Sequence, residues 1–118
     1  MVSSYEVASR AVKALDDKKA QDITVLKTEG VSVLADYFVI CTASSGTHAK
    51  TLVEECDKQL SEAGEPPLRR EGYRSGNWVL LDFGCVVVHV FLADTRAFYG
   101  LERLWADAQS IDYKSMIE

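Results

Sequence analysis

The chain has 118 residues, of which 47% are hydrophobic and 26% charged, and this composition fits one folded domain with a single core. Its formal net charge of −5, with no basic run beyond Arg69 and Arg70, argues against direct, sequence-specific nucleic-acid binding, because Lys and Arg must neutralise phosphates there. No run of residues has the pattern of a signal peptide or the length to span a bilayer, so we expect a cytoplasmic protein without a membrane segment.

The first half of the chain is predicted to form two helices and two strands. Apolar residues recur at helical spacing over residues 4–19, after a capping-box pattern. A β-branched run at residues 23–26 predicts a strand, and the nearly unbroken apolar run within residues 36–42 predicts a central strand covered on both faces. The letters SSGT then lead into a second helix, which Gly64 ends and two prolines prevent from continuing.

The second half is predicted to form an edge strand, a hairpin and a helix. Residues 68–73 fit a short edge strand, and the hairpin turns at Gly84 and Cys85. A last helix is expected from about residue 94 to 108, and residues 109–118 show no clear period, so we expect a loose tail after a single domain of residues 1–108. This order of elements predicts an α/β fold with a small mixed β-sheet flanked by helices.

The predicted hairpin has two different faces, because alternate side chains of a strand point to opposite sides of the sheet. One face is entirely apolar and is expected to turn to the core: Val79, Leu81, Phe83, Val86, Val88 and Val90. The other face mixes aromatic, apolar and ionisable side chains: Trp78, Leu80, Asp82, Val87, His89 and Phe91. Since the second face is neither plain core nor plain solvent, it is the first place to look for function.

The last predicted helix carries a similar mixture opposite its apolar stripe. The stripe is expected to consist of Ala97, Leu101, Leu104, Trp105 and Ala108. The opposite side has Arg96, Tyr99, Arg103 and Asp107, with Glu102 beside them. Aromatic and Arg side chains are the types that anchor protein interfaces. The hairpin face and this side of the helix therefore predict a protein-binding surface.

A metal site is a weaker interpretation of the same sequence. Cys85 and His89 are four residues apart on a strand, which separates them by about 13 Å, whereas zinc ligands converge within about 2.0–2.3 Å of the ion. The three cysteines are too widely spaced for a disulfide framework, and we expect Cys41 and Cys56 to be small core residues. No metal and no cofactor are therefore expected.

Phosphate binding and catalysis are also weaker interpretations. The letters SSGTH precede a helix N-terminus, where backbone N–H groups can bind an anion, but helix capping by Ser45 or Thr47 explains the same letters. Asp82 and His89 share a face without a nucleophile or a second metal-binding carboxylate, so we do not expect an enzyme. A nucleotidyltransferase-like enzyme or nucleotide-binding module that uses Asp82 is the competing hypothesis for the function.

Three stretches resemble the ribosome silencing factor family, also called Iojap-related proteins: GNWVLLDFGCVVVHV, RAFYGLERLW and ADYFVICTASSGTHAKTLVEE. Together they extend the resemblance over roughly residues 5–108. The resemblance implies a fold related to the nucleotidyltransferase core, without that superfamily's catalytic carboxylates. It also implies a translation repressor that binds the large ribosomal subunit through large-subunit protein fourteen. Bound there, the protein would block joining of the small subunit and lower translation when nutrients are scarce.

The resemblance also assigns site residues position by position. By our inference the partner contacts are Trp78, Asp82, His89, Arg96, Tyr99 and Glu102. The supporting signature residues are Asp36, Leu101, Leu104 and Trp105. An acidic protein suits a basic ribosomal partner.

Four positions depart from the family's usual pattern: Ala43, Thr47, Cys85 and Gly100. We expect the departures to affect affinity more than fold. The mixed face and the edge strand are also compatible with a homodimer of the free protein.

Overall fold

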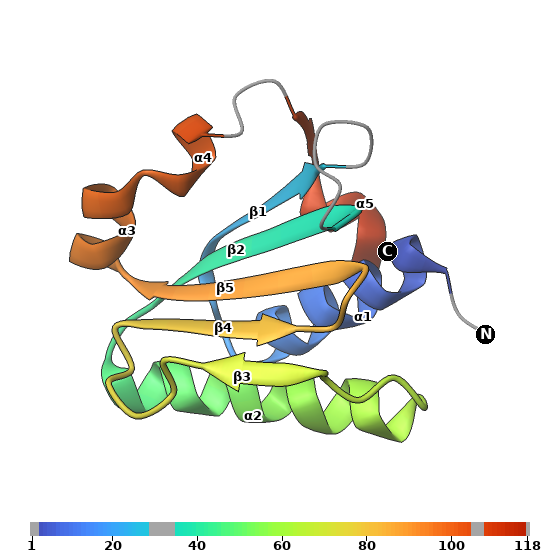
Figure 1. Cartoon of the computed structure of the whole chain (residues 1–118), viewed down its shortest axis with the longest axis horizontal. Coiled ribbons are helices and arrows are strands. Elements are labelled where there is room, and N and C mark those ends of the chain that lie inside the picture. The colour runs from blue at the N-terminus through green and yellow to red at the C-terminus, as the bar shows by residue number, and fades with distance from the viewer. Residues whose placement is uncertain (1–2, 29–34, 105–107, 118) are drawn as a thin grey trace.

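The computed structural model describes residues 3–28, 35–104 and 108–117, which form a mixed sheet flanked by helices, as predicted (Figure 1). In chain order the elements are α1 (Ser4–Asp17), β1 (Gln21–Lys27), β2 (Tyr37–Ala43), α2 (Gly46–Glu62), β3 (Arg69–Glu71), β4 (Trp78–Asp82), β5 (Val86–Leu92), α3 (Ala93–Tyr99), α4 (Leu101–Leu104), β6 (Gln109–Ile111) and α5 (Tyr113–Ile117). The six strands are ordered β3-β4-β5-β2-β1-β6. The predicted α/β fold is confirmed.

The middle of the sheet is the parallel pair β2 and β5, and every other neighbouring pair is antiparallel. All seven residues of β2 are buried, which confirms the prediction of a central strand covered on both faces. Parallel neighbours need a long crossover, and here α2, β3 and β4 provide it. The sheet therefore joins segments from both halves of the chain at its centre.

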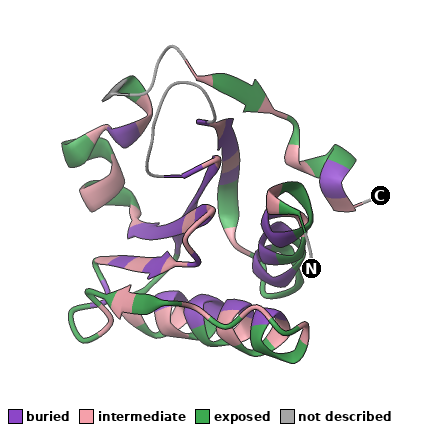
Figure 2. Ribbon diagram, turned by 45° about the vertical axis from the view of Figure 1, so that its right-hand side comes forward, coloured by how far each residue is buried: buried purple, intermediate pink, exposed green. Residues whose placement is uncertain are grey.

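The two faces of the sheet are covered differently (Figure 2). Helices α1, α2 and α5 contribute to the main core with one face, and Cys41 and Cys56 are fully buried there, as predicted. Burial raises the pKa of the Cys41 thiol to about 12, so it is an inert core residue. A smaller cluster, centred on Phe38, Ile40, Phe91 and Leu101, lies on the other face. No helix in the described segments is long and apolar enough to cross a bilayer.

The segment SSGTH caps α2, which confirms one of the two candidate caps. The Ser45 hydroxyl oxygen accepts a hydrogen bond from the His48 N–H at 3.1 Å. The His48 ring also bonds the Lys18 carbonyl through Nε2 at 2.8 Å and the Ser44 N–H through Nδ1 at 2.9 Å. This serine and histidine thus fasten the start of α2 to the loop after α1.

The hairpin of β4 and β5 has the predicted register. The Phe83 N–H donates to the Val86 carbonyl at 2.9 Å across the two-residue turn, and Asp82 lies opposite Val87. Gly84 has a φ of +87°, which favours glycine, and its N–H donates to the Asp82 carboxylate at 2.7 Å. The six residues of the apolar hairpin face are all buried, as predicted.

The predicted continuous helix over residues 94–108 is wrong. The helix is interrupted at Gly100, whose φ of +55° is a left-handed backbone conformation that favours glycine. Helix α3 ends at Tyr99, and α4 is a separate short turn. Ala97 of the predicted apolar stripe is exposed, whereas Leu101 is buried. The Leu104 side chain, Trp105 and Asp107 lie outside the described residues.

The prediction of a loose tail after residue 108 is also wrong. Strand β6 pairs with β1, with Ser110 opposite Leu26, so the sheet extends past the predicted end of the domain. Helix α5 follows, and Met116 is buried in the main core. Elements of three and five residues are too short to show a periodic pattern, which is why periodicity did not predict them.

Replacing the buried methionine tests whether this segment belongs to the fold. Met116→Ala should lower the free energy of unfolding by about 2 kcal/mol, because it removes buried apolar surface and leaves a cavity. Lys114→Ala, at an exposed position of the same helix, should change it by less than about 0.5 kcal/mol. Urea unfolding of the three proteins measures the difference, and equal stability of Met116→Ala and the unmodified chain would contradict the packing described.

Candidate protein-docking face

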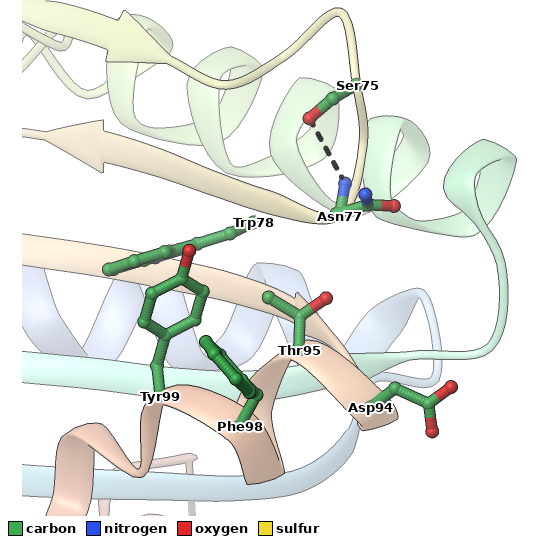
Figure 3. Close-up of a pocket in the computed structure, with 7 residues that line it drawn as sticks. All are labelled: Ser75, Asn77, Trp78, Asp94, Thr95, Phe98 and Tyr99. Carbon is green, nitrogen blue, oxygen red and sulfur yellow. Dashed lines mark hydrogen bonds between the residues drawn. The ribbon is translucent and has the colours of Figure 1, made fainter.

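A cluster of aromatic side chains lies where β4 begins and α3 ends (Figure 3). The Trp78 ring stacks on Phe91 with centroids 4.9 Å apart, and it contacts Tyr99 at 4.7 Å. Tyr99 in turn meets Phe98 edge to face at 5.1 Å. Phe98 is 79% exposed and Tyr99 50% exposed, although both are large and largely apolar. Such exposed aromatic groups are typical of surfaces that bind another protein.

A cavity of about 600 Å³ opens beside this cluster. Trp78, Phe98 and Tyr99 form its aromatic side, as Figure 3 shows. Its remaining lining is polar: Ser75, Asn77, Asp94 and Thr95. Aromatic walls with a polar rim suit a side chain inserted by a partner protein, because the apolar part loses water while the rim supplies hydrogen bonds.

His89 lies behind Trp78 rather than on the surface. Its Nδ1 accepts a hydrogen bond from the Trp78 Nε1–H at 3.1 Å, and only 4% of the residue is exposed. The imidazole is parallel to the Phe91 ring and meets Phe38 edge to face. Burial lowers its pKa from 6.5 to about 4, so His89 is neutral near pH 7. In the free protein His89 therefore orients the Trp78 indole.

Asp82 is separated from the aromatic cluster. It ends β4, about 13 Å along the strand from Trp78. One carboxylate oxygen accepts the Gly84 N–H, and the other forms an ion pair with the Arg69 guanidinium at 3.1 Å. Its side chain is 18% exposed. Asp82 thus fixes the hairpin turn and the neighbouring edge strand.

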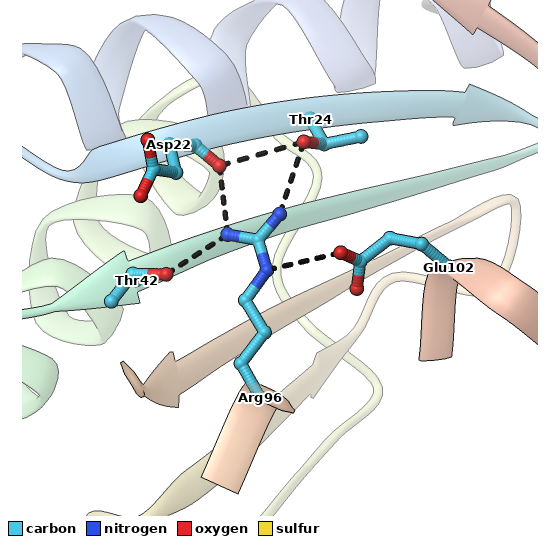
Figure 4. A network of polar contacts seen from close by, with 5 residues as sticks. All are labelled: Asp22, Thr24, Thr42, Arg96 and Glu102. Carbon is cyan, nitrogen blue, oxygen red and sulfur yellow. Dashed lines mark hydrogen bonds and ion pairs between the residues drawn. The ribbon is translucent and has the colours of Figure 1, made fainter. Parts of the chain in front are cut away.

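Arg96 reaches inward from α3 to the strands, as Figure 4 shows. Its Nη1 donates to the Asp22 carbonyl at 2.8 Å and to the Thr42 hydroxyl at 2.9 Å. Its Nη2 donates to the Thr24 hydroxyl at 3.0 Å. The Nε group pairs with Glu102 of α4 at 3.3 Å, and the Arg96 side chain is only 13% exposed. This network fastens α3 and α4 to β1 and β2.

The structure brings together only some of the predicted contact residues. Trp78 and Tyr99 share the exposed cluster, His89 supports it from behind, and Arg96 and Glu102 pair with each other. Among the supporting residues, Leu101 is buried under this face. Asp36 lies elsewhere, where its carboxylate accepts a hydrogen bond from the hydroxyl of Ser4 in α1.

Phe98 is absent from the predicted contacts, yet it is the most exposed large hydrophobic residue among those described. No signal in the sequence gave its exposure, because the inward side of this helix is set by the contacts of Arg96 with residues far away in the chain. With Arg96 turned inward, Phe98, two positions later, lies about 200° around the helix and points away from the strands, whereas Tyr99 lies closer to the side of Arg96 and contacts Trp78.

The fold and the cluster describe a small α/β domain with an exposed aromatic face that is a candidate for protein docking. The family described as "Ribosomal silencing factor during starvation" matches residues 2–118, and the chain belongs to this family. The ribosomal silencing factor RsfS of Halalkalibacterium halodurans is 42% identical over 98% of this chain and 99% of that protein.

Two further relatives extend the comparison. A crystal structure of a Chromobacterium violaceum protein superimposes with a TM-score of 0.87 at 37% identity, covering 89% of this chain and 88% of that one. The mouse protein named "Mitochondrial assembly of ribosomal large subunit protein 1" is 34% identical over 80% of this chain and 42% of its own length. Proteins similar to this chain thus occur in bacteria and in a mammal.

Removing the Arg96 guanidinium tests its role in holding α3. Arg96→Met should lower the free energy of unfolding by about 2 kcal/mol, because the partly buried Glu102 carboxylate and the strand hydroxyls lose their partner. Adding Glu102→Gln should restore part of the loss, and Arg103→Met at an exposed position should cost little. Thermal unfolding compares the four proteins; full stability of Arg96→Met would show that the network does not hold the helix.

The neutral state of His89 predicts a pH dependence of stability. Between pH 6.5 and 4 the unfolded chain binds a proton at this residue while the folded protein does not. Stability should therefore fall as the pH is lowered from 7 to 5, with about 2 kcal/mol due to His89. His89→Gln keeps a donor and an acceptor but cannot titrate, so its stability should fall less over the same range. Equal pH slopes for both proteins in urea unfolding would refute the assignment.

Proposed function

We propose that this protein represses translation by binding the large ribosomal subunit and blocking the joining of the small subunit. The partner is large-subunit protein fourteen, and the repression serves nutrient limitation. The observation that carries the proposal is the exposed aromatic cluster of Trp78, Phe98 and Tyr99 in a chain that belongs to the ribosomal silencing factor family. The mouse relative, named for ribosomal large-subunit assembly, supports the choice of subunit.

The charge of the protein supports a basic partner. Its net charge is −5, and ribosomal proteins are generally basic, so long-range attraction favours their encounter. Asp94 is exposed at the rim of the aromatic cavity, where a Lys or Arg of the partner can pair with it while an apolar neighbour enters the cavity. The face thus combines apolar contact area with a carboxylate at its edge.

Steric exclusion requires no chemistry from the bound protein. It needs only to occupy surface that the small subunit would use, and a domain with extents of 33 × 32 × 27 Å is large enough to do so. The competing hypothesis of nucleotide chemistry at Asp82 is less favoured, because both carboxylate oxygens already have partners in Gly84 and Arg69. In the described part of the chain, no three His, Cys, Asp or Glu side chains converge as metal ligands.

Truncating an exposed aromatic residue tests the proposed face. Tyr99→Ala and Phe98→Ala should each weaken binding to purified large subunits at least tenfold, since interface anchors of this type contribute about 2 kcal/mol or more. Phe98→Ala should leave thermal stability nearly unchanged and Tyr99→Ala should lower it only slightly, because Phe98 is 79% exposed and Tyr99 is 50% exposed. Co-sedimentation with large subunits over a concentration series measures the affinity.

The matched control is Tyr5→Ala, which removes a tyrosine of α1 that is 44% exposed and distant in the fold from α3. It should bind as tightly as the unmodified chain. Undiminished binding of both α3 variants, or an equal loss in Tyr5→Ala, would place the interface elsewhere.

A further inference from the structure

A second cavity, of about 250 Å³, lies on the same face of the sheet as the aromatic cluster. Its walls come from β2, β4 and β5, and a charged pair from β3 and β4 borders it. Six of the residues that line it are Phe38, Leu80, Val87, His89, Arg69 and Asp82. A hollow of about 260 Å³ adjoins both, since it shares Trp78 with the first cavity and Leu80 with the second. The three hollows therefore lie next to one another.

His89 contributes an unpaired hydrogen-bond donor to this cavity. Because Nδ1 accepts the Trp78 N–H, the proton of the neutral ring is on Nε2. That Nε2 group is buried and has no hydrogen-bond partner among the described residues. Buried donors are rarely left unpaired, since each one lowers the stability of the free protein. An acceptor supplied by a ligand would satisfy it.

The surroundings define which acceptor fits. Phe38, Leu80 and Val87 form apolar walls that suit an aliphatic side chain. At the border, the Arg69 guanidinium is 3.1 Å from Asp82 and 3.6 Å from Glu71, so two carboxylates face one cation. A further carboxylate is therefore disfavoured, whereas a neutral carbonyl meets no repulsion. Burial also keeps His89 neutral, which suits a neutral acceptor.

We propose that this cavity is a second anchoring site for the partner protein. It takes an aliphatic side chain of the partner, while a neighbouring backbone carbonyl of the partner accepts a hydrogen bond from the His89 Nε2–H. The identity of the partner rests on the proposed function, but the chemistry of the site does not. The free protein thus tolerates an unpaired donor that the complex satisfies.

Two changes in the cavity test this site on the large subunit. His89→Leu removes both the Nε2–H donor and the Nδ1 acceptor of the Trp78 N–H, whereas Val87→Phe fills the space and keeps both partners of the bond between His89 and Trp78. Each should weaken binding to large subunits about tenfold. Thermal stability should fall more in His89→Leu than in His89→Gln, because only the leucine leaves the Trp78 N–H without an acceptor. His89→Gln, which keeps a donor, should lose less affinity than His89→Leu. Leu68→Phe changes an exposed aliphatic residue outside the cavity and should bind normally.

A small probe tests the same site without ribosomes. N-acetyl-leucine N-methylamide carries an aliphatic side chain and two peptide carbonyls, and it is titrated into protein labelled with ¹⁵N at the histidine rings. The Nε2–H signal of His89 should move downfield in the unmodified chain and stay in place in Val87→Phe, while the His48 signal serves as the internal control.

The outcomes separate the two proposals. Unchanged affinity of both His89→Leu and Val87→Phe for large subunits would overturn the anchoring site while leaving the translation proposal intact. If the unmodified chain does not bind large subunits, the proposed function fails, and the probe alone decides the cavity. A probe that leaves the His89 signal unmoved at millimolar concentration would then overturn the site as well.

Discussion

Strands β4 and β5 have a different environment on each face of the sheet, because alternate side chains of a strand point to opposite faces. One set closes the main core against the helices, and the other set lies on the face that we propose for docking. The turn at Gly84 fixes this division, since a slip of one residue in register would exchange the two sets. The hydrogen bond from Gly84 to Asp82 and the ion pair between Asp82 and Arg69 hold that register at the end of the hairpin. Although Asp82 lies on the same side of the hairpin as Trp78, its contacts thus stabilise the fold of the hairpin.

The exposure of the aromatic cluster depends on a polar anchor beneath it. Arg96 is held by groups of β1, β2 and α4, so the inward side of α3 is occupied by a cation instead of an apolar stripe. The short helix has no buried residue of its own, and its aromatic pair is left to face solvent. Fixing α3 through its arginine leaves Phe98 and Tyr99 available for a partner without a large ordering cost on binding.

Local sequence patterns predicted the hairpin correctly. Its register, the two faces, the central strand β2 and the Ser45 cap follow from local patterns, and the structure confirms them. The inward turn of Arg96 could not be predicted in this way, because its partner Asp22 is 74 residues earlier in the chain. Helical periodicity carried through Gly100 put Ala97 on the wrong side, and β6 and α5 are too short for any period. The resemblance to a family named Trp78 and Tyr99 as candidate contacts, and the structure places their rings together, whereas the exposure of Phe98 follows only from the three-dimensional arrangement.

Steric exclusion is the central claim, and subunit joining measures it most directly. Large subunits are first saturated with the protein, the occupancy is checked by sedimentation, and small subunits are then added while light scattering follows the formation of joined ribosomes. Steric exclusion predicts a loss of the joined-ribosome signal in proportion to occupancy. Unchanged joining on fully occupied large subunits would contradict it.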